Sequence, residues 1–188
     1  MNFLDDLDQL NKNQDDGFRG TNDQVYNKHD YILSPDKNPE FFYGLCDMCE
    51  YYQIPYNKNG FLQEDLDKIT LLKANIHSEF SYFKDIISLD ELQYFYNLER
   101  IYMDAFFACC NLKSIIFPKN LKIISSWAFD KCLSLEKVIF PKNIEKIEDD
   151  AFGFCSSLKE IIIPEKFKDS IEYIFYNVDL TKVNITYI

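Results

Sequence analysis

The sequence predicts an α+β fold in which short β-strands are stacked in successive coils, behind a small N-terminal helical segment. Two observations carry this prediction. The C-terminal half repeats itself at a fixed interval in the sequence, and a helical apolar pattern begins near Pro39. A short repeat of this kind implies that each coil buries its apolar face only against its neighbours, so the coils must stack.

The repeat shows first in Pro118, Pro141 and Pro164, whose positions are evenly spaced. The same interval relates the cysteines, leucines and Ala-Phe pairs at Cys109, Cys132, Cys155, Leu112, Leu135, Leu158, Ala105-Phe106, Ala128-Phe129 and Ala151-Phe152. Self-similarity at this period, with a Leu-x-x-Ile-x-Phe core, is the signature of a leucine-rich repeat solenoid. We therefore predict a leucine-rich repeat domain over residues 85–188. Its clean strands are expected over 112–117, 135–140 and 158–163, with a degenerate strand over 89–94 and a closing strand over 180–185.

The part of the chain before this domain is predicted to form two further segments. Residues 1–38 are expected to be an acidic lead-in, because 11–38 are rich in Asn, Asp, Gln and Lys. Residues 39–84 are expected to be a helical cap. Asn38 caps its first helix, Pro39 occupies the first helical position and Glu40 suits the positive end of the helix dipole. The apolar face of this helix is predicted to consist of Phe41, Phe42, Leu45, Met48, Cys49 and Tyr52.

A loop from Pro55 to Leu66 follows this helix and is similar to a degenerate EF-hand calcium loop. Asn57, Asn59 and Gly60 stand at its third, fifth and sixth positions. Pro55 and Leu66 stand where the two acidic end ligands belong, so we expect calcium binding to be weak or absent. The loop would then serve as a turn before a second helix at about residues 63–69.

The six cysteines do not predict a metal or redox centre. The three repeated ones should stack inside the coils as small buried apolar groups. Cys46 and Cys49 form one C-x-x-C pair, but His29 and His77 are not at ligand-like spacings. We expect a reduced protein with no metal and no cofactor, in which Cys46 and Cys49 pack on one helix face.

The charge pattern limits the partners. Residues 1–90 carry 17 acids and 8 bases, a balance of −9, while residues 91–188 carry 14 and 12, a balance of −2. Contact with nucleic acid through phosphates is therefore not expected. The acidic half suits a basic protein partner, or serves only to keep an aromatic-rich chain in solution. No secretion signal or membrane span is predicted, which favours a cytoplasmic location.

The segment Leu135 to Leu158 resembles the BspA-like leucine-rich repeat family, since its Leu, Pro, Ala-Phe and Cys residues all fall in the register of that family. The resemblance covers about residues 86–165. Asp85 to Ile101 looks like the entry repeat of such proteins, and the loop ending at Leu66 looks like the calcium-loop-like segment that often precedes it. Members of the family are typically bacterial or protist surface proteins engaged in adhesion and protein binding. The resemblance thus implies a binding role and no catalytic residues.

The repeats themselves predict a binding face. Side chains alternate along a strand, so Ile115, Val138 and Ile161 should point inward. The predicted binding residues point outward and are Ser114, Ile116, Lys137, Ile139, Glu160 and Ile162. The isoleucine column could anchor a protein partner, or could simply pack across strands. Lys113, Lys119 and Lys142 would form a rim around it.

Two functions remain open at this stage. The first is a non-enzymatic protein-binding module. The second is an intracellular acidic inhibitor of a nucleic-acid-handling enzyme, such as a phage-borne anti-defence protein, in which the acidic half competes for a basic groove. An enzyme is disfavoured because the chain shows no nucleophile–base constellation and no glycine-rich phosphate loop.

Overall fold

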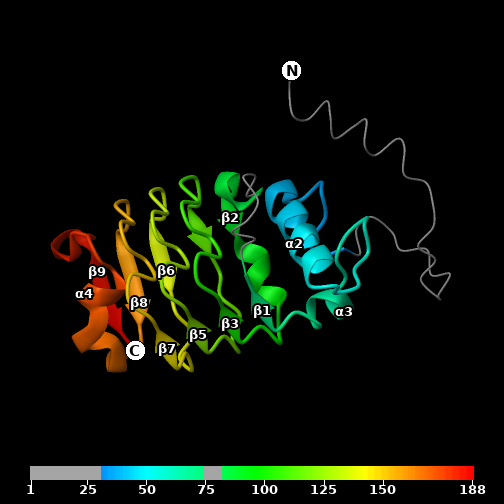
Figure 1. The fold of residues 1–188 in the computed structure, drawn as a ribbon. Helices are drawn as coiled ribbons and strands as arrows, with labels where there is room; N and C mark the ends of the chain where they lie inside the picture. Colours follow the sequence, from blue (N-terminus) through cyan, green and yellow to red (C-terminus); the bar gives the residue numbers. More distant parts are fainter. Residues whose placement is uncertain (1–30, 74–81) are drawn as a thin grey trace, which may run out of the picture.

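The computed structural model describes residues 31–73 and 82–188 (Figure 1). Most of the predicted acidic lead-in, including Asp15, Asp16 and Asp23, lies outside the described residues. The described residues form parallel strands stacked one behind the next, preceded by helix α2 (Pro39–Tyr51) and the short helix α3 (Gln63–Leu66).

Helix α2 begins where the sequence predicts. The Asn38 side-chain oxygen accepts a hydrogen bond from the Phe41 backbone N–H at 3.4 Å, and Pro39 lies in the first turn. The predicted apolar face is buried except for its last member, Tyr52, which is 39% exposed. Tyr52 lies outside because the helix ends at Tyr51, so its side chain no longer continues the helical face.

The segment after α2 is a tight turn. Phe61 and Leu33 form an antiparallel bridge, in which the Phe61 N–H donates to the Leu33 carbonyl at 2.8 Å. Gly60 lies directly against the Tyr31 ring, since an added Cβ would sit 2.4 Å from its Cγ. The predicted helix over 63–69 is wrong in length. At Lys68 and Ile69, each backbone N–H donates to the carbonyl three residues earlier, as in a 3₁₀ turn. Ile69, at the end of this turn, is buried ahead of the first strand.

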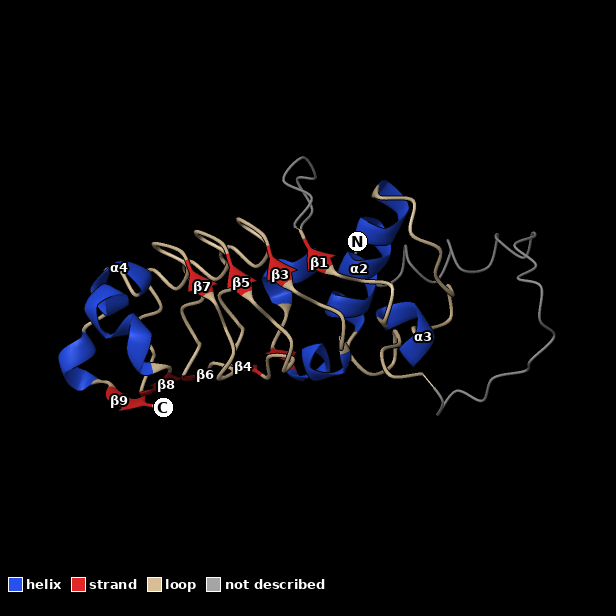
Figure 2. Cartoon of the chain, turned by 90° about the horizontal axis from the view of Figure 1, so that it is seen from below, coloured by secondary structure: helices blue, strands red, loops and turns tan. Residues whose placement is uncertain are grey.

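The strands form two rows, which Figure 2 shows facing one another across the molecule. One row is the sheet β1-β3-β5-β7, with bounds Leu71–Leu72, Arg100–Ile101, Ile123–Ile124 and Lys146–Ile147. The other row holds β2 (Ser88–Leu89), β4 (Ser114–Ile115), β6 (Lys137–Ile139), β8 (Glu160–Ile163) and β9 (Asn184–Tyr187). Every paired strand is parallel, and Ile101 pairs with Ile124, which in turn pairs with Ile147. The spatial register between these coils therefore equals the sequence repeat.

The two degenerate ends of the repeat region differ from the sequence prediction. The strand expected over 89–94 is the 3₁₀ helix η2 (Asp90–Tyr94), which follows η1 (Tyr82–Asp85) and the short strand β2. The Asp90 backbone N–H donates to the Ser88 Oγ at 3.1 Å and so turns the chain out of the strand. At the C-terminal end, the chain passes through η3 (Glu165–Ser170), α4 (Ile171–Ile174) and η4 (Leu180–Lys182), so the closing strand β9 starts only at Asn184.

Phenylalanines fill the interior as a column with the period of the repeat. Its members are Phe83, Phe106, Phe129, Phe152 and Phe175, with successive ring centroids 5.2, 5.1, 5.0 and 5.4 Å apart. Helix α2 adds Phe41 at one end, where its ring centroid lies 6.1 Å from that of Phe83 and 5.8 Å from that of Phe95. The column joins the helical segment to the coils in one apolar core.

The structure confirms that the three repeated cysteines are buried inside the coils. Cys109, Cys132 and Cys155 are fully buried and unbonded to one another. Each thiol also lies near a backbone carbonyl of the preceding coil, which the sequence did not predict. The acceptors are the carbonyls of Phe83, Phe106 and Phe129, at 2.9, 3.5 and 3.3 Å.

Candidate functional site

The predicted isoleucine column lies on β6 and β8 and at the residue directly after β4. We call the column Ile116, Ile139 and Ile162 the strand face. Ile116 and Ile139 are each 44% exposed, and Ile162 is partly buried. Ile139 pairs in register with Ile162, so the structure brings these two side chains together on neighbouring strands. Ile115, Val138 and Ile161 are buried, as the alternation predicts.

Polar residues run beside the isoleucines, and their groups are engaged within the chain. Lys137 Nζ lies 2.6 Å from Glu160 Oε2 across β6 and β8. Ser114 Oγ donates to Asp90 Oδ1 at 3.0 Å. Half-exposed ion pairs of this kind contribute little to stability, but they leave the column next to the isoleucines without net charge. The predicted rim lysines are all exposed: Lys113 directly precedes β4, and Lys119 and Lys142 lie in the turns after β4 and β6.

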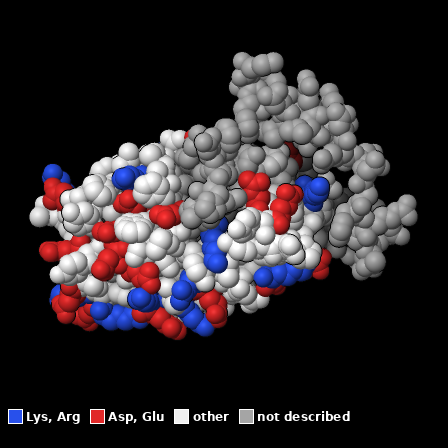
Figure 3. All heavy atoms as spheres, in the orientation of Figure 1, with Lys and Arg blue, Asp and Glu red and all other residues white. Residues whose placement is uncertain are grey.

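Charges elsewhere follow the repeat as well. Figure 3 shows lysines and acids interspersed along the lower edge, where β3, β5 and β7 lie in Figure 1. One ion pair there joins Lys122 Nζ to Glu99 Oε1 at 2.6 Å, and this hydrogen bond raises the pKa of Lys122. Oppositely charged residues one repeat apart therefore pair across the coils.

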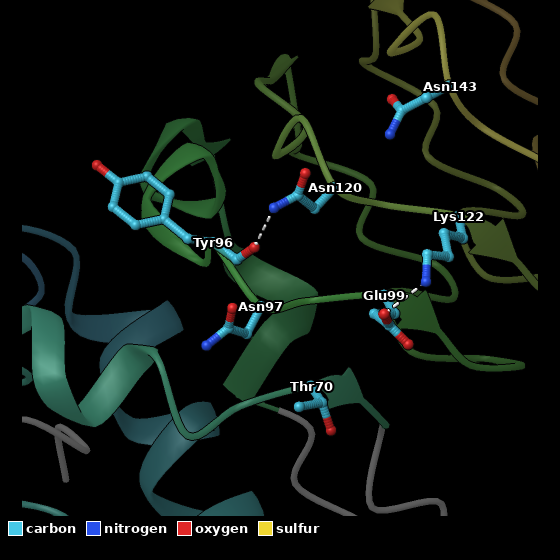
Figure 4. A pocket seen from close by; sticks show the side chains of 7 residues that line it. All are labelled: Thr70, Tyr96, Asn97, Glu99, Asn120, Lys122 and Asn143. Atoms are coloured by element: carbon cyan, nitrogen blue, oxygen red, sulfur yellow. Dashed lines mark hydrogen bonds and ion pairs between the residues drawn. The ribbon is translucent and has the colours of Figure 1, made fainter.

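A shallow depression of about 520 Å³ adjoins this edge (Figure 4). It is lined by Thr70, Tyr96, Asn97, Glu99, Asn120, Lys122 and Asn143. Its asparagines recur with the period of the repeat, and two of them donate to backbone: Asn120 to the Tyr96 carbonyl and Asn97 to the Asp67 carbonyl, each at 2.8 Å. The lining groups are thus used to join coils, and they form no catalytic constellation.

The cysteine pair of α2 is not prepared for metal or redox chemistry. Cys49 is buried and Cys46 is half-buried, and burial raises the pKa of both thiols to about 12. Thiolates are the metal ligands and nucleophiles, so both groups stay protonated at neutral pH. Within residues 31–73 and 82–188, no cluster of three His, Cys, Asp or Glu side chains has a metal-binding arrangement. His29 and His77 lie outside the described residues.

In the degenerate calcium loop, the remaining polar side chains form hydrogen bonds and an ion pair within the chain. Asn57 Oδ1 accepts from the Asn59 backbone N–H at 2.9 Å, and Asn57 Nδ2 donates to the Tyr31 hydroxyl at 3.3 Å. Asp65 accepts from the Leu62 N–H at 3.2 Å and pairs with Lys68 at 3.0 Å. The loop closes on itself through these bonds.

A second exposed surface was missed by the sequence prediction. It lies on the turns that lead from β3 to β4, from β5 to β6 and from β7 to β8, and on the start of the C-terminal segment. We call it the aromatic edge. Its members Phe107, Trp127, Phe154, Tyr173 and Tyr176 have exposed fractions of 41, 43, 40, 63 and 51%. The sequence did contain one sign of this surface: the residues at these positions differ from repeat to repeat, whereas the residues at the core positions do not.

Stacked parallel strands with few helices, together with an exposed strand face, define this chain as a leucine-rich repeat protein. A family model described as BspA type leucine-rich repeat region (six copies) matches residues 75–187. The chain belongs to this family, which confirms the resemblance stated above.

Among solved structures, the crystal structure of a leucine-rich repeat protein of T. pallidum is similar to this chain. The two are 21% identical with a TM-score of 0.35, and the match covers 44% of this chain and 58% of the other. The match thus spans little more than half of the T. pallidum chain. No curated protein matches the chain. Across the described residues, no helix has both the length and the apolar character needed to span a membrane.

Proposed function

We propose that this chain is a non-enzymatic protein-binding module: a leucine-rich repeat solenoid, closed at its N-terminal end by α2 and α3, that binds a protein partner through the strand face. Membership of the family supports protein interaction in general. The single observation that carries the choice of surface is the column of three isoleucines, one directly after β4 and one each on β6 and β8, two of them 44% exposed.

Recognition energy concentrates in a few apolar anchors that lose their water on binding. The strand face supplies such anchors on short, hydrogen-bonded strands, and the neighbouring charges of Lys137 and Glu160 are paired with each other. A partner that covers this pair therefore does not leave either of these two charges unpaired. The packing of Ile139 against Ile162 alone would stabilise the sheet without any partner, so an experiment must separate the two roles.

A pull-down from the native host with mass spectrometry identifies the prey, and the purified prey is then titrated against three variants. Ile139→Asp should lower affinity by at least about 30-fold, because a hot-spot anchor contributes roughly 2 kcal/mol or more. Ile139→Thr keeps the β-branched shape that suits a strand, so its folding is retained while affinity still falls. The third variant changes Asp15, Asp16 and Asp23 to Asn and should alter mainly the association rate and its salt dependence.

The outcomes are distinct. Loss of affinity in Ile139→Thr at unchanged unfolding midpoint supports the strand face. Loss of binding only in the charge-neutralised variant would reject it and favour the acidic inhibitor instead. A variant series in which Ile139→Thr lowers stability but leaves affinity unchanged assigns the column to sheet packing.

A further inference from the structure

The aromatic edge is one continuous surface. Backbone hydrogen bonds link its turns coil by coil: Ala108 N–H to the Asp130 carbonyl at 2.8 Å, and Lys131 N–H to the Gly153 carbonyl at 2.9 Å. The series continues from Phe154 N–H to the Tyr176 carbonyl at 2.8 Å. The Phe154 and Tyr176 rings meet edge to face with centroids 5.8 Å apart. The edge is separate from the strand face, because it lies on the turns that precede β4, β6 and β8.

The backbone of this edge does not favour the residues that it carries. Trp127 and Phe154 have φ values of +59° and +53°. Glycine, asparagine and aspartate tolerate this left-handed region, whereas bulky side chains are strained there. Other coils hold Asp104 and Asp150 at the position of Trp127, and Ala108, Lys131 and Asn177 at the position of Phe154. Trp127 and Phe154 are also 43% and 40% exposed, so packing compensates little. The turn of each coil imposes this φ, so the bulky Trp127 and Phe154 add strain that smaller residues avoid, and such strain is common at functional sites.

The edge already holds a cation. Lys131 Nζ lies 5.0 Å from the Phe107 ring centroid and 5.9 Å from that of Phe154. Both distances are in the range of cation–π attraction. The two rings therefore form a pair that accepts a positive group, and at present the chain's own lysine occupies it.

Negative groups accompany the rings. Asp130 is 5% exposed, and its Oδ1 has no hydrogen-bond partner among the residues that the structure describes. Its carboxylate fits there because the next coil has Gly153 at this point, where an added Cβ would lie 2.6 Å from Asp130 Oδ1. Asp150 Oδ2 accepts from the Trp127 indole N–H at 3.3 Å, which orients the indole on the surface. This carboxyl, whose positive neighbour is Lys131, adds a negative charge beside the ring pair, and its Oδ1 has capacity left to accept a hydrogen bond.

We propose that the aromatic edge is a second binding surface, which takes an arginine side chain of a protein partner between Phe107 and Phe154 in place of Lys131, with Asp130 as counter-charge. Arginine fits better than lysine because its planar guanidinium stacks on a ring while its N–H groups still donate to a carboxylate. The aromatic edge includes no residue of the strand face, so an experiment can reject binding at either surface without rejecting binding at the other.

The test uses the full chain and a capped tetra-arginine peptide, with tetra-lysine and tetra-glutamate peptides for comparison. Trp127 is the only tryptophan in the sequence and belongs to the edge, so its fluorescence reports binding at this place. We expect a saturable change in emission with tetra-arginine, a weaker one with tetra-lysine and none with tetra-glutamate. Phe107→Leu and Phe154→Leu keep charge and apolar character but remove the ring faces. Each should weaken tetra-arginine binding several-fold, and the double variant about tenfold or more.

Lys131→Met gives the decisive result, because it removes the competing cation while keeping a long apolar side chain. It should tighten tetra-arginine binding about threefold or more, a gain that misfolding cannot imitate. Ile139→Thr is the control on the strand face and should leave the titration unchanged. The variant with Asp15, Asp16 and Asp23 changed to Asn controls for general attraction to an acidic chain.

Three outcomes would overturn the proposal. The first is wild-type affinity for tetra-arginine in the Phe107→Leu, Phe154→Leu double variant, and the second is unchanged or weaker binding in Lys131→Met. The third is a loss of affinity in the charge-neutralised variant that is as large as the loss in the double phenylalanine variant. The last would show that tetra-arginine binds the acidic N-terminal segment.

Discussion

Phe129 and Phe152 stack with ring centroids 5.0 Å apart and planes 9° from parallel, although they belong to successive repeats of the sequence. Both rings are fully buried. Phe106 covers Phe129 on the side of the preceding coil at 5.1 Å. Each internal ring of the column therefore packs against a ring of the coil before it and a ring of the coil after it, which makes adjacent coils depend on one another.

Truncation of one ring in this column should be strongly destabilising. Phe129→Ala removes a fully buried ring from between two others and should lower the free energy of unfolding by about 3–5 kcal/mol. Urea unfolding followed by circular dichroism measures it. The matched control is Phe107→Ala, because Phe107 is 41% exposed and should cost less than about 1 kcal/mol. Similar losses in the two variants would show that the column is not the centre of the core.

Cys132 should tolerate serine better than its burial alone suggests. Its thiol lies 3.5 Å from the Phe106 carbonyl, so a serine hydroxyl can find a hydrogen-bond acceptor. We expect Cys132→Ser to cost about 1 kcal/mol, at the lower end of the roughly 1–3 kcal/mol for burying a hydroxyl. Urea unfolding of the two chains measures the difference, and a cost above that range would mean that the carbonyl does not accept the hydroxyl.

The same cysteines should be unreactive in the native protein. Burial raises the pKa of Cys109 and Cys132 well above that of an ordinary thiol, and the reactive species is the thiolate. Labelling with a thiol reagent under native conditions should modify the half-buried Cys110 before either of them. Rapid modification of Cys132 in the folded chain would contradict its place inside the coils.

Calcium should neither bind tightly nor stabilise the chain. Pro55 and Leu66 replace the end ligands, and Asn57 Oδ1 is already engaged by the Asn59 backbone N–H. Thermal unfolding with and without low-millimolar calcium should give the same midpoint. A rise of several degrees that disappears in Asn57→Ala would show that the loop still binds the ion.

Asp130 should make the stability of the chain depend on pH. Burial raises the pKa of its carboxyl above 3.8, Asp150 and Asp104 raise it further, and Lys131 opposes them. Because the native pKa exceeds the unfolded one, the native state gains stability from protonation as the pH falls through that raised value towards 3.8, and is penalised above it. Asp130→Asn, which imitates the protonated carboxyl, should therefore raise the unfolding midpoint at pH about 7, and the gain should shrink towards pH about 4. A gain of equal size at both pH values would contradict an unpaired carboxylate.

Replacement of Trp127 should not destabilise the chain. At a φ of +59°, a bulky residue is strained by roughly 1–2 kcal/mol, which asparagine largely avoids. Trp127→Asn should therefore leave stability unchanged or raise it by up to about 1 kcal/mol. Chemical unfolding followed by circular dichroism checks this. A clear loss of stability would mean that the indole, through its hydrogen bond to Asp150, supports the fold rather than a partner.

Much of the fold could be predicted from the sequence because each repeat folds into the same coil. A residue that recurs once in every repeat, such as Cys132 or Phe129, must occupy the same slot in each coil, so burial and parallel register follow from spacing alone. The start of α2 at Asn38 and Pro39 was also local, since capping is decided by adjacent residues. The outward position of Ile139 followed from strand alternation. Its role in binding stays a prediction.

Other features depended on contacts between segments that are distant in the sequence. The 3₁₀ helix η2 stands where a strand was expected, and its two ends have distant partners: Ser114 Oγ donates to Asp90 Oδ1 at 3.0 Å, and Gln63 Nε2 donates to the Tyr94 carbonyl at 2.7 Å. The position of Phe41 at the end of the ring column requires that α2 fold back on coils that come much later in the chain. The pairing of Lys131 with two rings from neighbouring coils, and the unpaired Asp130 oxygen opposite Gly153, arise only when three coils are stacked. Spacing in the chain determined which residues share a coil position; the stacking of the coils decided which unlike side chains meet on its surface.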